Sequence, residues 1–220
     1  MQRVALARSI VYRPKLLLLD EPLSNLDAKL RLRLRDDLRR ILKAAGITAL
    51  YVTHDQTEAV ALGDRIGVMR DGKLLQMGTP DEIYNRPADL FVANFTGATN
   101  ELTGTLVARN GAYGVIEFGD GSRGEAALLH NVSPGDKVRI ALRPETLRIG
   151  GGGSANVFPA QVTDRRYQGT QTVYDIALFG KRLEALELGT AARHEVGATT
   201  VALAREGCWA YRDEGAAGEE

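Results

Sequence analysis

The first hundred residues alternate between short, fully apolar runs and stretches in which apolar residues recur at helical spacing. The run 16–19 consists of four leucines and ends abruptly at Asp20. A short run that is apolar at every position predicts a strand buried on both faces, as in the middle of a parallel sheet. Residues 28–45 carry an apolar stripe opposite arginines and aspartates, which predicts a long amphipathic helix closed by Gly46. Residues 47–53 predict a second strand.

A strand, a helix and a second strand in this order predict a crossover connection between parallel strands. The carboxyl ends of both strands then lie at one edge of the sheet, where open α/β sheets bind ligands. We therefore expect Asp20, Glu21 and His54 to lie on neighbouring strand ends. The remaining elements predicted in this part are helices over 2–11, 56–63, 88–95 and from Thr79-Pro80, and a hairpin over 65–77 that turns at Asp71-Gly72.

The pattern changes after Gly97, where short alternating runs lie between glycine turns. Such runs predict a small all-β barrel or a pair of barrels. Glycines at 150–153 predict a flexible linker. The segments 140–145 and 201–206 are similar to one another, which indicates an internal repeat. The predicted strands cover 102–108, 113–118, a run after Asp120-Gly121, 137–142, 158–165, 172–178, 182–186 and 199–204.

Composition narrows the function classes. The chain has 28 basic and 28 acidic side chains, so no net charge attracts it to nucleic acid or to an anionic membrane. The single Cys208 excludes an internal disulfide, and without a Cys/His cluster we expect no structural zinc site. The start has no signal-peptide pattern, and no apolar run has the length that a bilayer requires. We expect a cytoplasmic chain.

Two adjacent carboxylates and a histidine at one strand edge can hydrolyse a nucleoside triphosphate. One carboxylate can hold Mg²⁺ through water, because Mg²⁺ keeps much of its hydration shell. The other can orient and deprotonate the attacking water. A histidine within reach can donate a hydrogen bond to the γ-phosphate.

The motifs occur in the order and spacing of a known family. Residues 16–21 resemble the Walker B strand and catalytic glutamate of ATP-binding-cassette (ABC) ATPases. Residues 24–27 resemble their D-loop, residues 53–55 their switch histidine, and residues 2–8 the helix after their signature motif. The resemblance implies a partial P-loop NTPase fold of α/β class over 1–97.

By this resemblance, Asp20 is the Mg²⁺ ligand, Glu21 the general base and His54 the γ-phosphate contact. Asp27 reaches across a dimer interface to the partner's nucleotide, and Gln2 also belongs to the nucleotide-binding residues. Asp27 has a second interpretation as the N-cap of the long helix, and the two roles are compatible. The implied cofactors are ATP and Mg²⁺.

The phosphate-binding motif G-x-x-x-x-G-K-[S/T] and the sequence Leu-Ser-Gly-Gly do not occur in the 220 residues. Without the backbone N–H groups and lysine of that loop, most contacts to a triphosphate are missing. We therefore interpret the chain as the carboxyl-terminal part of a longer ATPase, either a fragment or the product of a misplaced start at Met1. We expect it to be inactive alone. Because its sheet is truncated, we also expect it to expose an apolar edge and to be unstable or to aggregate.

The β-region resembles the transport-associated OB (TOBE) domain of importer ATPases. Residues 100–104, 142–145 and 167–169 carry this resemblance, together with 78–84 and 87–93. It implies an all-β OB-like domain over 98–212. The tail at 213–220 is acidic and glycine-rich, which predicts disorder. The subgroup comprises ATPases of sugar, polyamine and ferric-iron importers. The implied partners are a second ATPase subunit in a homodimer, transmembrane permease subunits and, indirectly, an external solute-binding protein. The implied location is the cytoplasmic face of the membrane.

Alternatives remain open. The second function class is a non-catalytic module whose β-domain senses a small ligand beside an inert ATPase remnant. A DNA-repair type of ABC ATPase is disfavoured by the β-domain and by the absence of coiled-coil heptads. Nucleic-acid binding by an OB-like fold needs a basic groove with stacking aromatics, and only 165–167 combine the two. The transported solute is not encoded here, although 100–104 is closer to the polyamine and iron branch than to the sugar branch.

Overall fold

The structure is a computed structural model that describes residues 8–12, 14–24, 26–129, 132–151 and 156–213. The chain divides into two compact units, residues 1–87 and 88–220. By its contacts helix α5, Leu90–Phe95, packs within the second unit. The sequence assigns α5 to the ATPase part by resemblance, and that domain assignment stays a prediction. Each unit is described by itself.

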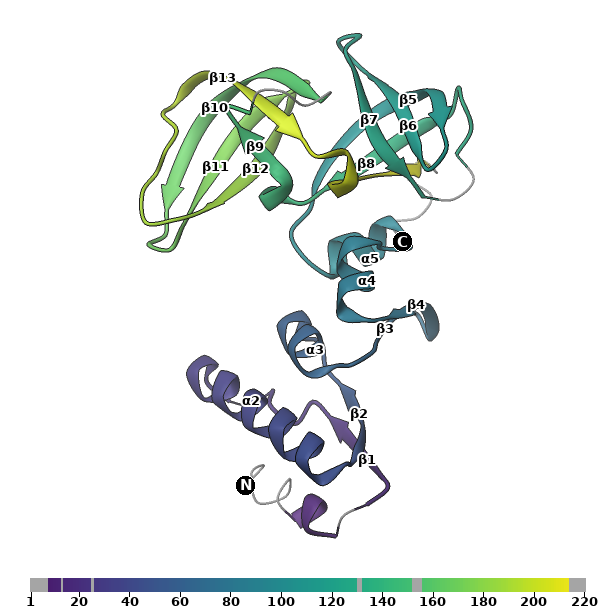
Figure 1. Ribbon diagram of the computed structural model, residues 1–220, viewed down its shortest axis with the longest axis vertical. Coiled ribbons are helices and arrows are strands. Elements are labelled where there is room, and N and C mark those ends of the chain that lie inside the picture. Colours follow the sequence, from purple (N-terminus) through teal and green to yellow (C-terminus); the bar gives the residue numbers. More distant parts are fainter. Residues whose placement is uncertain (1–7, 13, 25, 130–131, 152–155, 214–220) are drawn as a thin grey trace. The chain divides into compact units, whose positions relative to one another are not determined.

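The first unit is built around a strand–helix–strand motif (Figure 1). Strands β1 (Leu16–Asp20) and β2 (Thr48–Val52) pair in parallel, and helix α2 (Ala28–Ala45) connects them. The Asp27 side chain caps α2 by accepting a hydrogen bond from the Leu30 N–H at 3.0 Å. Gly46 ends α2 in the left-handed region at φ 63°, which glycine adopts without steric cost. The predicted motif is therefore confirmed.

Strand β1 is buried on one face only. Leu17 and Leu19 pack against Leu38 of α2, whereas Leu16 and Leu18 are 55% and 67% exposed. On β2, Leu50 and Val52 are likewise 58% and 50% exposed. The prediction of a strand buried on both faces is wrong for this chain, because α2 supplies only one covering layer. The described residues of the unit hold no second layer for the other face.

We expect this exposed apolar face to make the chain self-associate. Leu18 and Leu50 are register partners, so the double substitution Leu18→Glu with Leu50→Lys replaces an apolar pair by an ion pair. Burying a leucine side chain contributes about 1.5–3 kcal/mol, so the double variant should shift sedimentation profiles from aggregate to monomer. Leu188→Glu, at a position 73% exposed in the second unit, is the control. An equal effect of the control variant would assign the association to another surface.

The rest of the first unit follows the predicted order. It comprises α3 (Gln56–Leu62), the antiparallel strands β3 (Ile66–Arg70) and β4 (Lys73–Gly78), and α4 (Pro80–Asn85). Asp71 and Gly72 both have positive φ, 50° and 75°, as a two-residue hairpin turn of this kind requires. Thr79 and Glu82 form a capping box at the start of α4.

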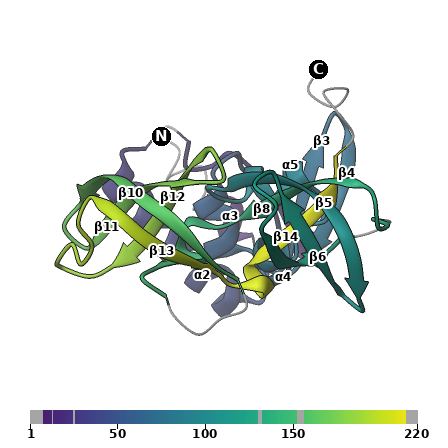
Figure 2. The same ribbon diagram turned by 90° about the horizontal axis from the view of Figure 1, so that it is seen from above.

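The second unit consists of a closed barrel and a five-stranded sheet (Figures 1 and 2). The barrel order is β14-β7-β6-β5-β8, and the sheet order is β12-β11-β10-β13-β9. The barrel-like, OB-type class predicted for this region is therefore confirmed. The bounds are β5 Asn100–Asn110, β6 Tyr113–Phe118, β7 Arg123–Leu128, β8 Lys137–Leu142, η1 Pro144–Thr146, β9 Leu147–Ile149, β10 Val157–Tyr167, β11 Gln171–Leu178, β12 Lys181–Leu188, β13 Gly197–Leu203, η2 Arg205–Gly207 and β14 Cys208–Arg212.

The second unit is an internal repeat whose halves exchange their last strands. Strands β5 to β8 lead through η1 into β9, which pairs with β13 of the other sheet. Strands β10 to β13 lead through η2 into β14, which returns to the barrel and pairs with β8 and β7. The similar segments 140–145 and 201–206 each form the end of a strand and the turn that crosses over. The indicated repeat is therefore present in the structure.

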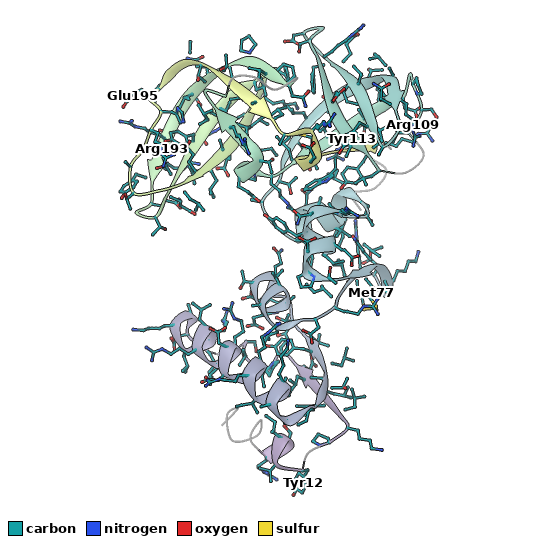
Figure 3. The ribbon with its side chains drawn as sticks, in the orientation of Figure 1. Tyr12, Met77, Arg109, Tyr113, Arg193 and Glu195 are labelled. Carbon is teal, nitrogen blue, oxygen red and sulfur yellow. The ribbon has the colours of Figure 1, made fainter. Side chains whose placement is uncertain are left out.

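The two halves share one core. The rings of Phe118, Phe158 and Phe179 meet with centroid distances of 4.2 to 5.6 Å. Asn100 hydrogen-bonds both backbone groups of Glu184 at 2.7 Å, and Asn156 does the same to Glu125 at 2.7 Å. Each asparagine thus joins one half to a strand of the other. The connection between β12 and β13 carries Arg193 and Glu195 (Figure 3).

Candidate functional site

Two predicted residues meet at the carboxyl edge of the β1–β2 pair. Asp20, the last residue of β1, is the register partner of Val52, the last residue of β2. The N–H of Glu21 donates to the carbonyl oxygen of Val52 at 2.9 Å, which extends the pairing by one residue. Glu21 Oε1 and His54 Nδ1 are 2.8 Å apart. Parallel pairing therefore joins an acid and a base that are 33 positions apart in the sequence.

Glu21 has a strained backbone. Its φ of 43° is in the left-handed region, which residues other than glycine rarely adopt. The turn is held by Ser24, whose hydroxyl and N–H both donate to the Glu21 carbonyl oxygen, at 3.0 and 3.3 Å. Strain of this kind is concentrated at functional sites, where it fixes a side-chain direction. Here it accompanies the side chain that contacts His54.

The contact changes the pKa of His54. The hydrogen bond and the charge of Glu21 raise the pKa of the imidazole above its ordinary value of 6.5, with smaller contributions from Asp55 and Glu58. The ion pair therefore contributes fully below pH 6.5 and is lost as the pH rises through the raised pKa of His54. The His54 side chain is 73% exposed, so solvent screens the pair. Both groups remain accessible to a ligand.

Asp20 presents one exposed carboxylate at the end of β1. Among the residues that the structure describes, no group of three His, Cys, Asp or Glu side chains converges to form a complete metal cage. A single carboxylate suits Mg²⁺, which keeps most of its water ligands and binds through one or two carboxylates plus phosphate oxygens. The residues present at this strand end therefore fit Mg²⁺ rather than a cation that needs several protein ligands.

Of the two remaining predicted residues, the structure describes Asp27 but not Gln2. Asp27 lies at the end of the turn and caps α2, so its structural role is confirmed and its role across a dimer stays a prediction. Gln2 lies outside the described residues, as do the other residues before Arg8. The structure brings Glu21 and His54 together, and Asp20 directly precedes Glu21 in the sequence.

Sequence reasoning missed a polar network behind these residues. Arg31 of α2 contacts Asp55 at 3.3 Å and lies 3.9 Å from Glu58, whose side chain is buried. The Thr57 hydroxyl, followed by backbone N–H groups, holds the pKa of Asp55 below its ordinary value. Burial, followed by Glu58, raises the pKa of Tyr51. One pattern in the sequence could have indicated this network. Asp55 is a helix-cap residue, and a second acid, Glu58, follows it three residues later.

Comparison with known proteins finds one matching domain family and several similar proteins. Residues 140–210 match the TOBE domain family. The chain is 47% identical over 175 residues to the spermidine/putrescine import ATP-binding protein PotA of Rubrobacter xylanophilus, covering 79% of this chain and 46% of that protein. It is 40% identical over 208 residues to PotA 1 of Pseudomonas aeruginosa, covering 93% and 56%. It is 41% identical over 179 residues to the Fe(3+) ions import ATP-binding protein FbpC of Agrobacterium fabrum, covering 80% and 48%.

These matches show that the chain is similar to the ATP-binding proteins of ABC importers and that residues 140–210 correspond to a TOBE domain. The chain spans about half the length of the curated relatives that it matches. Within the described residues, no helix combines the length and the apolar character needed to cross a bilayer.

Proposed function

We propose that the chain is the carboxyl-terminal part of the subunit that hydrolyses ATP to drive solute import. The observation that carries this proposal is the Glu21–His54 contact of 2.8 Å at the strand edge where Asp20 ends β1. A base, a hydrogen-bond donor and a metal-binding carboxylate on adjacent strand ends suit phosphoryl transfer to water. This arrangement supports ATP hydrolysis as the function of the α/β part.

The roles follow from the chemistry of the side chains. Glu21 accepts a proton from the attacking water and orients that water, which is the task of a general base. His54 holds Glu21 in place and, with its other ring nitrogen, can donate to a phosphate oxygen. Asp20 would hold Mg²⁺ through its exposed carboxylate. Bound MgATP supplies the transferable phosphoryl group and the cation that neutralises its charge.

We propose that the complete site needs residues from outside the chain. A Gly-rich loop that cradles the phosphates does not occur in the 220 residues. Asp27 and Gln2 would serve the nucleotide site together with a second ATPase subunit in a homodimer. Transmembrane permease subunits would bind the dimer at the cytoplasmic face of the membrane and receive solute from an external binding protein.

We propose that the imported solute is of the polyamine or ferric-iron type. The relatives at 40–47% identity are named for spermidine/putrescine and for Fe(3+) ions, and the segment 100–104 agrees with that branch. The solute itself would be selected by the permease and the external binding protein. No residue of this chain is assigned to solute recognition.

A fusion protein tests the proposed ATPase. It joins the part of the Pseudomonas aeruginosa relative that precedes the aligned segment to residues 1–220. We expect the fusion to release phosphate from MgATP and the chain alone to release no more than buffer. A folded, monodisperse fusion without activity would contradict the ATPase proposal. Phosphate release by the purified chain alone would contradict its description as a part.

A second candidate is a non-catalytic, ligand-sensing module. The observation in its favour is that the second unit has its own closed barrel and core. The DNA upstream of Met1 separates the two functions. An in-frame Gly-rich loop and Leu-Ser-Gly-Gly would support the ATPase, whereas a genuine stop codon and promoter would support the module.

A further inference from the structure

Arg31, in the first turn of α2, lies where three segments of the first unit meet. Its Nη2 donates to two carbonyl oxygens of the turn after β1, those of Ser24 at 3.3 Å and Leu26 at 3.0 Å. Its Nη1 donates to Asp55 Oδ2 at 3.3 Å, in the segment after β2. One guanidinium thus connects the segment that carries Glu21 to the segment that carries His54.

The segment around His54 is fixed from its other side. Asp55 caps α3, because its Oδ1 accepts from the N–H groups of Thr57 at 2.9 Å and Glu58 at 3.2 Å. The carboxylate of Glu58 accepts from the hydroxyls of Tyr51 at 2.8 Å and Thr53 at 3.0 Å. The Thr53 oxygen in turn accepts from the Asp55 N–H at 2.9 Å. His54 is therefore flanked by two residues whose side chains are held in this network.

We propose that Arg31 is a positioning residue that, through the carbonyl groups of Ser24 and Leu26, holds the turn after β1 against the segment 53–58, so that Glu21 and His54 face one another. The inference deepens the proposed function, because it concerns the pair to which we assign ATP hydrolysis. Among the described residues, Arg31 forms no hydrogen bond or ion pair with Glu21 or His54. It therefore acts through the backbone of one segment and the helix cap of the other.

Two observations separate this role from general packing. First, α2 and α3 have other ties, since Arg39 donates to the Ala61 carbonyl oxygen at 2.5 Å, and Arg39 and Lys43 both pair with Asp64. Second, Arg31 Nε forms no hydrogen bond among the described residues but lies 3.9 Å from Glu58 Oε1, which gives Arg31 a second ionic contact to the segment 53–58.

The sign of a pKa change distinguishes positioning from simple electrostatics. The groups that affect His54 are Glu21, Asp55 and Glu58, all of which raise its pKa. Arg31 is a cation near these acids. Removing its charge from an unchanged structure would therefore leave the pKa of His54 where it is or raise it. Loss of the Glu21 contact would instead lower it toward 6.5.

The experiment is an NMR titration of the His54 ring in the 220-residue chain without nucleotide, with every variant made in the Leu18→Glu, Leu50→Lys background that we expect to be monomeric. The sequence has 3 histidines, so His54→Gln identifies the signal. We expect a raised pKa in the wild type and a return to about 6.5 in Glu21→Gln, which defines the lower limit. In Arg31→Gln, the pKa of His54 should fall to the same lower limit. Arg31→Lys keeps the charge but has fewer donors in a fixed geometry. The pKa of His54 in this variant should therefore lie between the values for the wild type and for Glu21→Gln.

Arg39→Gln is the matched control, because it removes the same charge from the same helix without touching either segment. We expect its His54 pKa to equal that of the wild type. If Arg31→Gln keeps or raises the pKa, the proposal is wrong. If Arg31→Gln does not fold, Arg31→Lys provides the test. An unchanged His54 pKa in Arg31→Lys would overturn the proposal. Because no nucleotide is present, an inactive fusion protein would leave this result standing.

Discussion

Replacing Glu21 by Gln in the fusion protein is expected to lower the rate of ATP hydrolysis by about 10²–10⁴-fold, the usual contribution of a general base. Gln retains the size of Glu21 and can still contact His54 Nδ1, which lies 2.8 Å from Oε1 in the wild type. It cannot accept a proton from water, so the chemical step is lost. The measurement is steady-state phosphate release at saturating MgATP.

The controls separate chemistry from folding. Glu195→Gln changes an exposed acid on the connection between β12 and β13, and we expect it to leave the rate unchanged. His54→Ala removes the partner of Glu21 and should also slow hydrolysis. A Glu21→Gln fusion with wild-type turnover would assign the base to another residue and would withdraw Glu21 from the site.

Replacing Arg143 by Met is expected to destabilise the second unit by about 1–3 kcal/mol for each buried carbonyl group that loses its donor. Arg143 is 1% exposed. It donates to the carbonyl oxygens of Ala93 at 2.7 Å and Gly97 at 2.9 Å, and its guanidinium lies 5.5 Å from the centroid of Trp209. Met fills part of the space but leaves those buried carbonyl groups without their donor.

Denaturant unfolding of the chain measures this effect, with Trp209 fluorescence reporting on the second unit. Arg148→Met is the matched control, because Arg148 is exposed on β9 and a surface change of this kind is within about 0.5 kcal/mol. The free energy of unfolding of Arg143→Lys should lie between those of Arg143→Met and Arg148→Met. One ammonium group cannot reach all the carbonyl and hydroxyl groups that the planar guanidinium contacts. A Met variant as stable as the Arg148→Met control would show that Arg143 is not needed for the fold.

The contrast between Glu21 and Arg143 shows what could be predicted from sequence. Glu21 was found because the leucine run, its abrupt end and the next strand are local patterns, and parallel pairing brings their ends to one edge. The roles of Asp20, Glu21 and His54 came from a family resemblance, and they stay predictions. Arg143 was noted only as part of a motif. The groups to which its side chain donates hydrogen bonds lie 44 to 50 residues away in the chain, which no local pattern indicates.

The same distinction applies to burial. An alternating or fully apolar pattern shows which side chains tend to avoid water, but not which layers are present to cover them. Leu17 and Leu18 are equivalent in the sequence, yet one is 6% and the other 67% exposed, because α2 covers only one face of the strand pair. The similar segments 140–145 and 201–206 indicated a repeat, but the exchange of β9 and β14 between its halves was not predictable.

The sequence by itself determined the order of the helices and strands, the caps of α2 and α4, the edge at which Glu21 meets His54, and the resemblance to importer ATPases. These depend on neighbours within a few residues or on motifs at fixed spacing. Only the tertiary structure decided which face of β1 is open, how the halves of the second unit share one core, and where Arg31 and Arg143 donate their hydrogen bonds. These depend on contacts between residues far apart in the chain, which are set by how the elements pack.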